Sequence, residues 1–333
     1  MCTRILWSSL GSTRMAQGGP DKGNVLVGRS MDWYQDTDTV LAVRPRGEER
    51  WSTPSTPDDP GNFTWTSEYG SVVALMYRRA AVDGINEAGF QASGLYLSES
   101  EYGERDTSRP GIELYWAIQW LLDRFGTVDD AVREFTDRNV QLVAETVGGR
   151  PGTAHVALAD RNGDSAVIEF RGGKAVVRHG EQYTVMANSP WFDEQLELQK
   201  RYVGLGGDLP LPGGVDSPDR FARAAYYSAR LPATSDMREA TAYMFSVIRN
   251  ASAPFGTADE VRPNISTTRW RTVADLTDGR YFYESTTSPN VVWVELSQLD
   301  FSEGRPELLL DVATEPDHVG NVTGEFTPAR APR

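Results

Sequence analysis

The chain begins Met1-Cys2-Thr3-Arg4-Ile5-Leu6-Trp7-Ser8, and Cys2 is the only cysteine among its 333 residues. With no second thiol, Cys2 cannot form an internal disulfide. Removal of Met1 would leave Cys2 with a thiol and a free α-amine on one residue. A deprotonated thiol is a good nucleophile, and an α-amine, whose reference pKa is roughly 7.7–8.0, can act as a base near neutral pH. The position of Cys2 therefore predicts a nucleophile that carries its own base, the alternative being a lone buried cysteine.

The overall charge argues against several classes of partner. The chain has 47 acidic and 33 basic residues, for a net charge of −14, with 39% hydrophobic and 24% charged residues. These proportions are typical of a globular protein. Nucleic acids and anionic membranes both require a basic surface, so we expect neither as a partner. The sequence has no apolar run of 18 residues, and we therefore expect no transmembrane helix.

The compartment depends on whether Met1 is the native start. Residues 1–14 lack the basic start, the apolar stretch and the small-residue cleavage site of a signal peptide. We therefore expect a cytoplasmic protein if the start is native, and a periplasmic or secreted one if a leader has been trimmed.

No motif in the sequence indicates a metal or an organic cofactor. The three histidines, His155, His179 and His318, are not spaced as zinc ligands. We also find no Walker loop, dinucleotide fingerprint or nucleophile-elbow serine. A dyad of Cys2 with His155 or His179 remains an alternative, but the scarcity of histidine favours the α-amine of Cys2 as the base.

Blocks of strands and helices predict an α+β fold in one domain over residues 1–312, followed by a polar tail over 313–333. Apolar residues at helical spacing predict a helix over 114–125 and a second over 127–135. Ser217-Pro218 is a typical helix start, and Asp236 with Glu239 has capping-box spacing for a helix through Ile248. Strands are expected at 2–8, 24–27, 39–43, 72–77, 153–159, 165–170, 174–177, 183–187, 271–276, 280–284, 291–296 and 308–312.

Four residues are candidates for a site around Cys2: Arg29, Asp32, Asn188 and Arg220. Arg29 and Asp32 are three residues apart, so on a regular strand they point to opposite faces, and both reach one site only if the strand bends or ends. The alternative for this pair is two solvated charges at a strand end. Asn188 follows a strand and could donate to an oxyanion, or it is a turn residue before Ser-Pro. Arg220 lies near a helix start, where a cation interacts unfavourably with the helix dipole. Its presence there therefore needs another explanation.

Five segments carry a family resemblance: Met1-Cys2-Thr3, Gly28-Arg29-Ser30-Met31-Asp32, Asp83-Gly84-Ile85-Asn86-Glu87-Ala88-Gly89, Asn188-Ser189-Pro190 and Arg220-Phe221. Together they resemble the choloylglycine hydrolase family of N-terminal nucleophile hydrolases, which includes penicillin V acylases and bile salt hydrolases. In the third segment Ala88 replaces the family's lysine. The resemblance runs in order from residue 2 to about residue 302.

Further segments resemble the penicillin V acylase-like branch first seen in Gram-negative bacteria: Ser98-Glu99-Ser100-Glu101-Tyr102, Ser266 to Val273, and Ser288-Pro289-Asn290. The branch lines its acyl pocket with tryptophans. Trp33 keeps one of these, whereas Tyr96 stands at the other position, which is a departure. This makes Trp33, Tyr34 and Tyr96 the expected substrate-binding residues.

The resemblance implies a four-layer αββα sandwich and a bacterial amidase that needs no cofactor or metal. After loss of Met1, Cys2 would attack a linear amide and form an S-acyl enzyme. Asp32 would hold the amine, Arg29 and Arg220 would balance charge, and Asn188 with the Tyr96 backbone amide would stabilise the oxyanion. The expected partner is a small-molecule amide, and relatives that are often homotetramers imply a homo-oligomer.

Penicillin V acylase-like activity is the leading expectation, with N-acyl homoserine lactones as natural substrates by analogy with the branch. The first alternative is a bile salt hydrolase, which Trp33 and Tyr96 disfavour. The second is a catalytically silent ligand-binding protein on the same scaffold. The third is another N-terminal-cysteine amidase, such as a glutamine amidotransferase domain or a dipeptidase. An amidotransferase would need a synthase domain, for which we expect no room in this chain.

Overall fold

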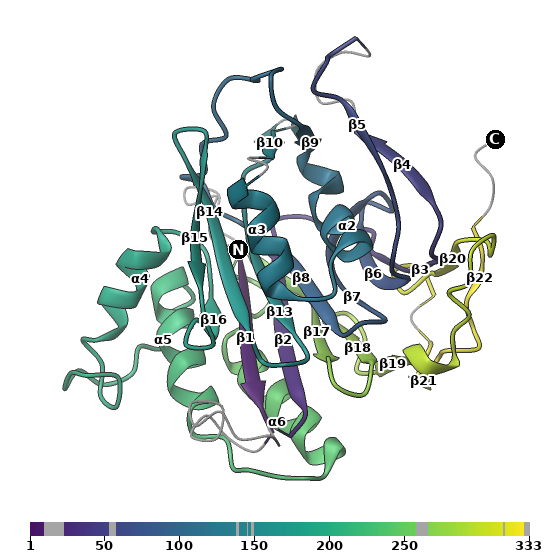
Figure 1. The fold of residues 1–333 in the computed structure, drawn as a ribbon. Helices are drawn as coiled ribbons and strands as arrows, with labels where there is room; N and C mark the ends of the chain where they lie inside the picture. Colours follow the sequence, from purple (N-terminus) through teal and green to yellow (C-terminus); the bar gives the residue numbers. More distant parts are fainter. Residues whose placement is uncertain are drawn as a thin grey trace.

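A computed structural model describes residues 1–9, 23–52, 58–137, 140–144, 146–147, 150–257, 266–315 and 317–329. Within these residues two large sheets form the centre of the protein (Figure 1). The first has seven strands, in the order β16 (Val185–Met186), β1 (Cys2–Ser8), β2 (Val25–Trp33), β17 (Thr267–Asp275), β18 (Arg280–Ser285), β19 (Val291–Glu295) and β21 (Gly320–Asn321).

The second sheet has nine strands within the described residues. Their order is β15 (Lys174–His179), β14 (Ser165–Arg171), β13 (Ala154–Asp160), β8 (Phe90–Tyr96), β7 (Ala80–Asn86), β6 (Ser71–Met76), β3 (Val40–Arg44), β20 (Leu308–Leu310) and β22 (Thr327–Pro328). Short strand pairs join β4 (Glu49–Ser52) to β5 (Phe63–Thr66), β9 (Gly111–Glu113) to β10 (Gln141–Val143), and β11 (Thr146–Val147) to β12 (Arg150–Pro151).

Helices cover the outer face of each sheet. The helices α2 (Leu114–Arg124) and α3 (Val128–Asp137) pack on the nine-stranded sheet, and α5 (Ser217–Ser228) and α6 (Met237–Asn250) pack on the seven-stranded sheet (Figure 1). One hydrophobic core lies between the sheets and under α5 and α6, and a second lies under α2 and α3. This arrangement confirms the four-layer αββα sandwich.

The strands β1 and β2 are buried along almost their whole length because both of their faces are covered. Polar side chains on them must therefore find partners inside the protein. Arg4, for example, is fully buried and donates to Leu158 O (2.9 Å) and Ser165 Oγ (3.1 Å) of the other sheet. The start of β1, and Cys2 with it, is thus held between two layers.

The predicted helices are present, but the central strands β7 and β8 were not among the expected strands, and several short elements also differ. Strand β17 begins at Thr267, four residues earlier than expected. The helix α4 (Phe192–Gln199) was not expected, because its eight residues are too few to show a clear helical period. Residues after 312, expected as a polar tail, contribute β21 and β22 to the edges of the two sheets. No helix in the described part of the chain is long and apolar enough to cross a membrane.

Candidate active site

Cys2 lies at the buried start of β1, opposite Met31 of β2. Its Sγ is 3.6 Å from Met31 Sδ and 3.9 Å from Nη2 of Arg29. The Arg29 guanidinium is fixed by Gly94 O (2.7 Å), which accepts from Nη2, and by Val82 O, which accepts from Nη1. A cation is therefore held next to the sulfur, on the side of Cys2 that faces the second sheet.

Asp83 forms a buried ion pair with Arg29. Its Oδ1 is 3.7 Å from Arg29 Nη1, and both groups are almost fully buried. Tyr281 OH (2.6 Å) and Thr272 Oγ1 (2.8 Å), both in the seven-stranded sheet, donate to Oδ2 of Asp83. Burial and the Asp83 carboxylate raise the pKa of Tyr281, so its hydroxyl keeps the proton that it donates. Asp83 thus fixes Arg29 and links the two sheets.

Asp32 and Arg220 lie on the other face of β2, towards α5. Thr268 Oγ1 donates to Asp32 Oδ1 (2.6 Å), and Arg220 Nη1 is 3.6 Å from Asp32 Oδ2. That Oδ2 is buried, and among the described residues it has no hydrogen-bond donor. Arg29 and Asp32 therefore do point to opposite faces. Arg29 lies on the face of the Cys2 thiol, and Asp32 lies on the face of Arg220, which binds the backbone of Cys2.

Arg220 connects three parts of the site. Its Nη1 donates to Cys2 O (2.6 Å) and to Thr3 Oγ1, and its Nη2 donates to Asn188 Oδ1 (2.7 Å). Burial lowers the pKa of the Arg220 guanidinium, and the carboxylate of Asp32 opposes that shift. The unfavourable position of this cation at a helix start is explained by these contacts, which face inward from α5.

Asn188 contacts the nucleophile's own backbone. Its Oδ1 accepts from Cys2 N (2.6 Å), and its Nδ2 donates to Tyr96 O (2.6 Å). The backbone of Asn188 is held by Ser217, whose Oγ accepts from Asn188 N (2.8 Å), and by Gln195, whose Nε2 donates to Asn188 O. The side-chain amide of Asn188 is therefore oriented by two helices and lies between Cys2 and Tyr96.

Met1 occupies the space beside Cys2. Its amine donates to Asp32 O (2.7 Å) and to Ser266 Oγ (3.3 Å), and it lies completely buried. Burial lowers the pKa of this amine below its ordinary value of 8.0, while Cys2 and Asp32 act in the opposite direction. An N-terminal amine at this end of β1 is therefore more readily unprotonated than one in water.

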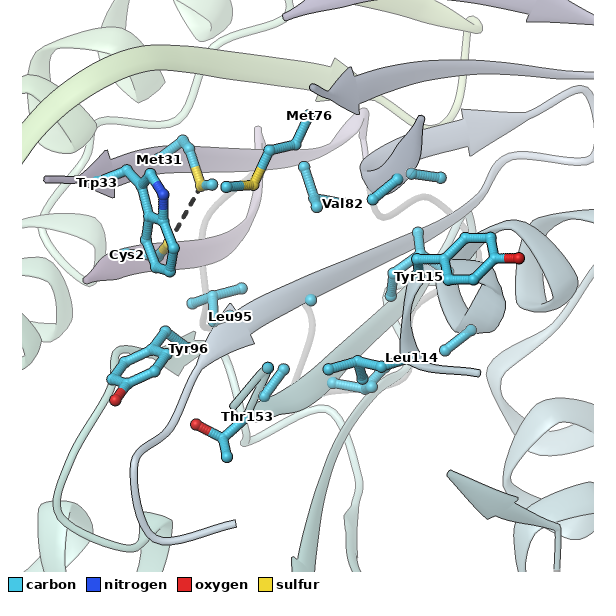
Figure 2. Close-up of a pocket in the computed structure, with 18 of the residues that line it drawn as sticks. Cys2, Met31, Trp33, Met76, Val82, Leu95, Tyr96, Leu114, Tyr115 and Thr153 are labelled. Atoms are coloured by element: carbon cyan, nitrogen blue, oxygen red, sulfur yellow. Dashed lines mark hydrogen bonds between the residues drawn. The ribbon is translucent and has the colours of Figure 1, made fainter. Parts of the chain in front are cut away.

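A cavity of about 150 Å³ opens beside Cys2. Figure 2 shows Cys2, Met31 and Trp33 at one end, and Leu114 and Tyr115 at the other. The Trp33 indole Nε1 donates to Tyr77 OH (2.8 Å), and its ring meets Tyr96 edge to face at 6.0 Å between centroids. Trp33, Tyr34 and Tyr96, which the sequence predicts to bind substrate, all line this cavity. Their role in binding stays a prediction.

His155 and His179, the alternative partners of Cys2, contact other groups. His155 Nε2 is 2.9 Å from Ala187 O, and His179 Nε2 is 2.7 Å from Asp164 Oδ2. In the described part of the chain, no group of three or more His, Cys, Asp or Glu side chains could hold a metal ion.

The structure brings Cys2, Arg29, Asp32, Tyr96, Asn188 and Arg220 into one contact network. Sequence reasoning did not assign the residues that hold them, because no local signal marks a partner that is distant in the chain. These residues are Thr268, Gln195, Ser217 and Ser266. Ser266 and Thr268 lie in a segment that resembles the branch but was given no role, and Ser217 was interpreted only as a helix start, since Ser-Pro opens α5.

Three comparisons with known proteins agree with this geometry. Residues 15–311 match the linear amide C–N hydrolases of the choloylglycine hydrolase family. A penicillin V acylase of Pectobacterium atrosepticum is 37% identical over 97% of this chain and 91% of its own length. A bile salt hydrolase/transferase of Bifidobacterium longum is 24% identical over 78% of this chain and 83% of its own length.

Solved structures are similar along nearly the whole chain. The structure of a penicillin V acylase from Agrobacterium tumefaciens superposes with a TM-score of 0.86 at 40% identity, covering 99% of this chain and 98% of that one. A conjugated bile acid hydrolase variant from Clostridium perfringens superposes with a TM-score of 0.75 at 20% identity, covering 93% and 97%, which is a likeness of fold alone.

Proposed function

Because the chain belongs to the choloylglycine hydrolase family of linear amide C–N hydrolases, we propose that Cys2 is its nucleophile and that its preferred substrates carry an aryl or long acyl group. The observation that carries this proposal is the position of Cys2. The thiol lies at the end of an apolar cavity, its backbone N–H is bonded to Asn188, and two arginines flank it.

Loss of Met1 converts the buried N–H of Cys2 into an amine with new protons to donate. The acceptor best suited to receive one is Asp32 Oδ2, which is buried without a donor. Asn188 Oδ1, which already accepts from Cys2 N, would keep that role. Removing Met1 also clears the cavity wall beside the thiol, since Met1 is among the lining residues.

The reaction then proceeds in two steps. The α-amine takes the thiol proton, the sulfur attacks the amide carbonyl carbon, and a C–S bond forms. The tetrahedral intermediate collapses with cleavage of the C–N bond, and the α-ammonium gives its proton to the leaving amine. Water, deprotonated by the same α-amine, attacks the S-acyl carbonyl; the C–S bond breaks, and the thiol recovers its proton.

The oxyanion of each step needs donors that are already oriented. Asn188 Nδ2 and the backbone N–H of Tyr96 are the proposed pair, and Asn188 Nδ2 already lies against the Tyr96 backbone. The Arg29 guanidinium, 3.9 Å from the sulfur, offsets the negative charge that the sulfur carries when it attacks.

The aromatic lining favours the acyl group of a penicillin V acylase. Trp33, Tyr34 and Tyr96 surround the end of the cavity near Cys2, where the phenoxy ring of a phenoxyacetyl amide would lie. The similarity to two penicillin V acylases, at 37% and 40% identity, supports the same assignment. N-acyl homoserine lactones are a second class of amide whose acyl chain suits an apolar cavity.

A panel of amides combined with intact mass spectrometry tests this function. The panel contains phenoxyacetyl, straight-chain fatty acyl and cholyl amides, and we expect turnover of the first two and little of the third. Binding without turnover, in protein shown to lack Met1, would instead identify a silent ligand-binding protein.

A further inference from the structure

The nine-stranded sheet is open beside the site, between β7 and β8. Asp83 and Ser93 form the last pair of the ladder that joins the two strands. Both strands continue past this pair, as residues 80–82 of β7 and 94–96 of β8, which are described but not paired with each other. The two strands therefore separate on the side of the sheet nearest to Cys2.

A β-bulge in β7 explains the separation. Asp83 pairs with Ala74 of β6, whereas Ala81 pairs with the next residue, Leu75, so Val82 is the extra residue. A bulge bends its strand and disrupts the ladder on either side. Here it turns residues 80–82 towards β6 and away from β8.

Arg29 spans the opening. Its Nη1 donates to Val82 O on one strand, and its Nη2 donates to Gly94 O (2.7 Å) on the other. A single side chain thereby satisfies one backbone carbonyl group on each side of the opening.

The cavity beside Cys2 passes through this opening. The nine-stranded sheet separates the two hydrophobic cores, yet the cavity is lined by residues of both. Figure 2 shows Leu95 and Val82 between the end at Cys2 and the end at Leu114. From the core between the sheets come Cys2, Met31 and Leu95, and from the core under α2 come Ala117, Ile118 and Val156.

On the basis of the function proposed above, we propose that the opening between β7 and β8 is a passage that forms the far part of the acyl site. A straight acyl chain whose carbonyl carbon is at Cys2 extends between β7 and β8 and ends under α2, at Ala117 and Ile118. The substrate class that uses this passage is the amides of unbranched, medium- to long-chain fatty acids. A broad, rigid ring system does not fit between two backbone strands.

Gly94 sets the width of the passage. A Cβ built on Gly94 would lie 3.4 Å from Cγ1 and 3.6 Å from Cδ1 of Ile118, which is ordinary van der Waals contact. Gly94→Ala therefore narrows the passage without a clash, and Gly94→Val narrows it further. Ile118→Ala removes the wall at the far end and should lengthen the passage.

The experiment measures kcat/KM for a series of straight-chain acyl amides of one chromogenic amine, from four to fourteen carbons, with the phenoxyacetyl amide as the short reference. In the unmodified protein we expect kcat/KM to rise about fourfold per methylene, equivalent to ~0.8 kcal/mol, until the chain reaches α2. Relative to the phenoxyacetyl amide measured with the same variant, Gly94→Val should end the rise at a shorter chain. Ile118→Ala should move the end of the rise to a longer chain.

Gly324→Ala is the matched control, because a Cβ there meets no atom within 4 Å, and its chain-length profile should be unchanged. Melting temperatures identify any variant that fails to fold. The proposed passage would be contradicted if kcat/KM of the unmodified protein did not change with chain length. An equal loss of kcat/KM at all chain lengths in Gly94→Val would also contradict it.

Direct binding separates this passage from the proposed function. Calorimetry measures the affinity for straight-chain fatty acids, which are the products of the reaction. We expect this affinity to increase with chain length, and Gly94→Val should remove the increase for long chains only. If binding follows this pattern while no amide is hydrolysed, the catalytic function fails and the passage stands. If the phenoxyacetyl amide is hydrolysed but length affects neither rate nor binding, the passage fails alone.

Discussion

Two arginines flank Cys2 from opposite faces of β2, and they have different surroundings. Arg29 is 3.9 Å from the sulfur and is anchored to the second sheet, whereas Arg220 binds the backbone carbonyl of Cys2 and the side chain of Asn188. In the proposed mechanism the first offsets charge at the sulfur, and the second holds the geometry of the amine and the oxyanion donor.

Asn188 offers a test that separates its two contacts. Asn188→Ala should lower kcat by about 10²–10³, because an oxyanion donor is lost. Asn188→Asp keeps an acceptor for Cys2 N but has no Nδ2 donor, so it should lose a similar factor. Steady-state kinetics measures both. Near-normal activity of Asn188→Asp would mean that the acceptor, and not the donor, is what the reaction requires.

The pH dependence should report the amine of Cys2. Burial lowers the pKa of the Met1 amine, and the Asp32 carboxylate acts in the opposite direction. The Cys2 amine that loss of Met1 would free lies at the same buried start of β1, so we expect the same two effects on its pKa. The base must be unprotonated, so kcat/KM should be full above that pKa and fall as the pH drops through it, and Asp32→Asn should move the midpoint to lower pH.

A pH titration of kcat/KM for the unmodified protein and Asp32→Asn checks this expectation. An activity that increases as the pH falls, or a midpoint that Asp32→Asn moves upward, would contradict the amine as the base.

At the residue scale, most members of the site could be selected from the sequence because they lie in segments that resemble the family. Tyr96 is the exception, since it was selected only because it stands where the branch has a tryptophan. What it could not supply was the network that holds them. Thr268 contacts Asp32 across 236 positions, and Ser266 contacts the amine across 265. Such pairs leave no trace in spacing or periodicity.

At the scale of elements, α4 and the start of α5 form a clamp on Asn188. Gln195 Nε2 donates to Asn188 O, to Pro190 O (3.2 Å) and to Ser217 Oγ (3.1 Å). It is a positioning residue, since it acts on Asn188 through the backbone. The sequence did not predict α4, so it could not predict this clamp either.

Gln195→Leu should lower kcat about tenfold, or about 1.4 kcal/mol in activation free energy, with KM almost unchanged. The reason is that the oxyanion donor shifts while the acyl cavity keeps its shape. Gln199→Leu, at the other end of α4 and half-buried, is the control and should behave as the unmodified protein does. A change in KM alone would show that α4 acts on substrate binding instead.

The β-bulge at Val82 is another element-scale feature that sequence patterns do not reveal. The sequence predicted no strand over residues 80–86, because Asp83-Gly84 is typical of a tight turn. The extra residue becomes visible only in the pairing with β6. The helices α2, α5 and α6 were predictable because they have long apolar periods or clear caps.

At the scale of the molecule, Asp83 ties the two sheets together around Arg29. Gln91 and Ser93 donate to it from the nine-stranded sheet, and Thr272 and Tyr281 donate from the seven-stranded sheet. The four-layer arrangement followed from the resemblance of the whole chain, but this buried link between layers did not.

Asp83→Ala should lower the free energy of unfolding by about 3–5 kcal/mol, because it leaves Arg29 buried without its carboxylate. Asp83→Asn retains one acceptor oxygen and should lose less. Urea unfolding measures both changes. Equal stability of Asp83→Ala and the unmodified protein would show that the link contributes nothing to holding the sheets.

The most direct test of Cys2 as an N-terminal nucleophile is rapid-quench intact mass spectrometry of active protein during turnover of a phenoxyacetyl amide. We expect a protein that lacks Met1, with a transient acyl adduct that maps to Cys2 and is absent in Cys2→Ala. Full activity in protein that retains Met1, or turnover by Cys2→Ala, would contradict the account.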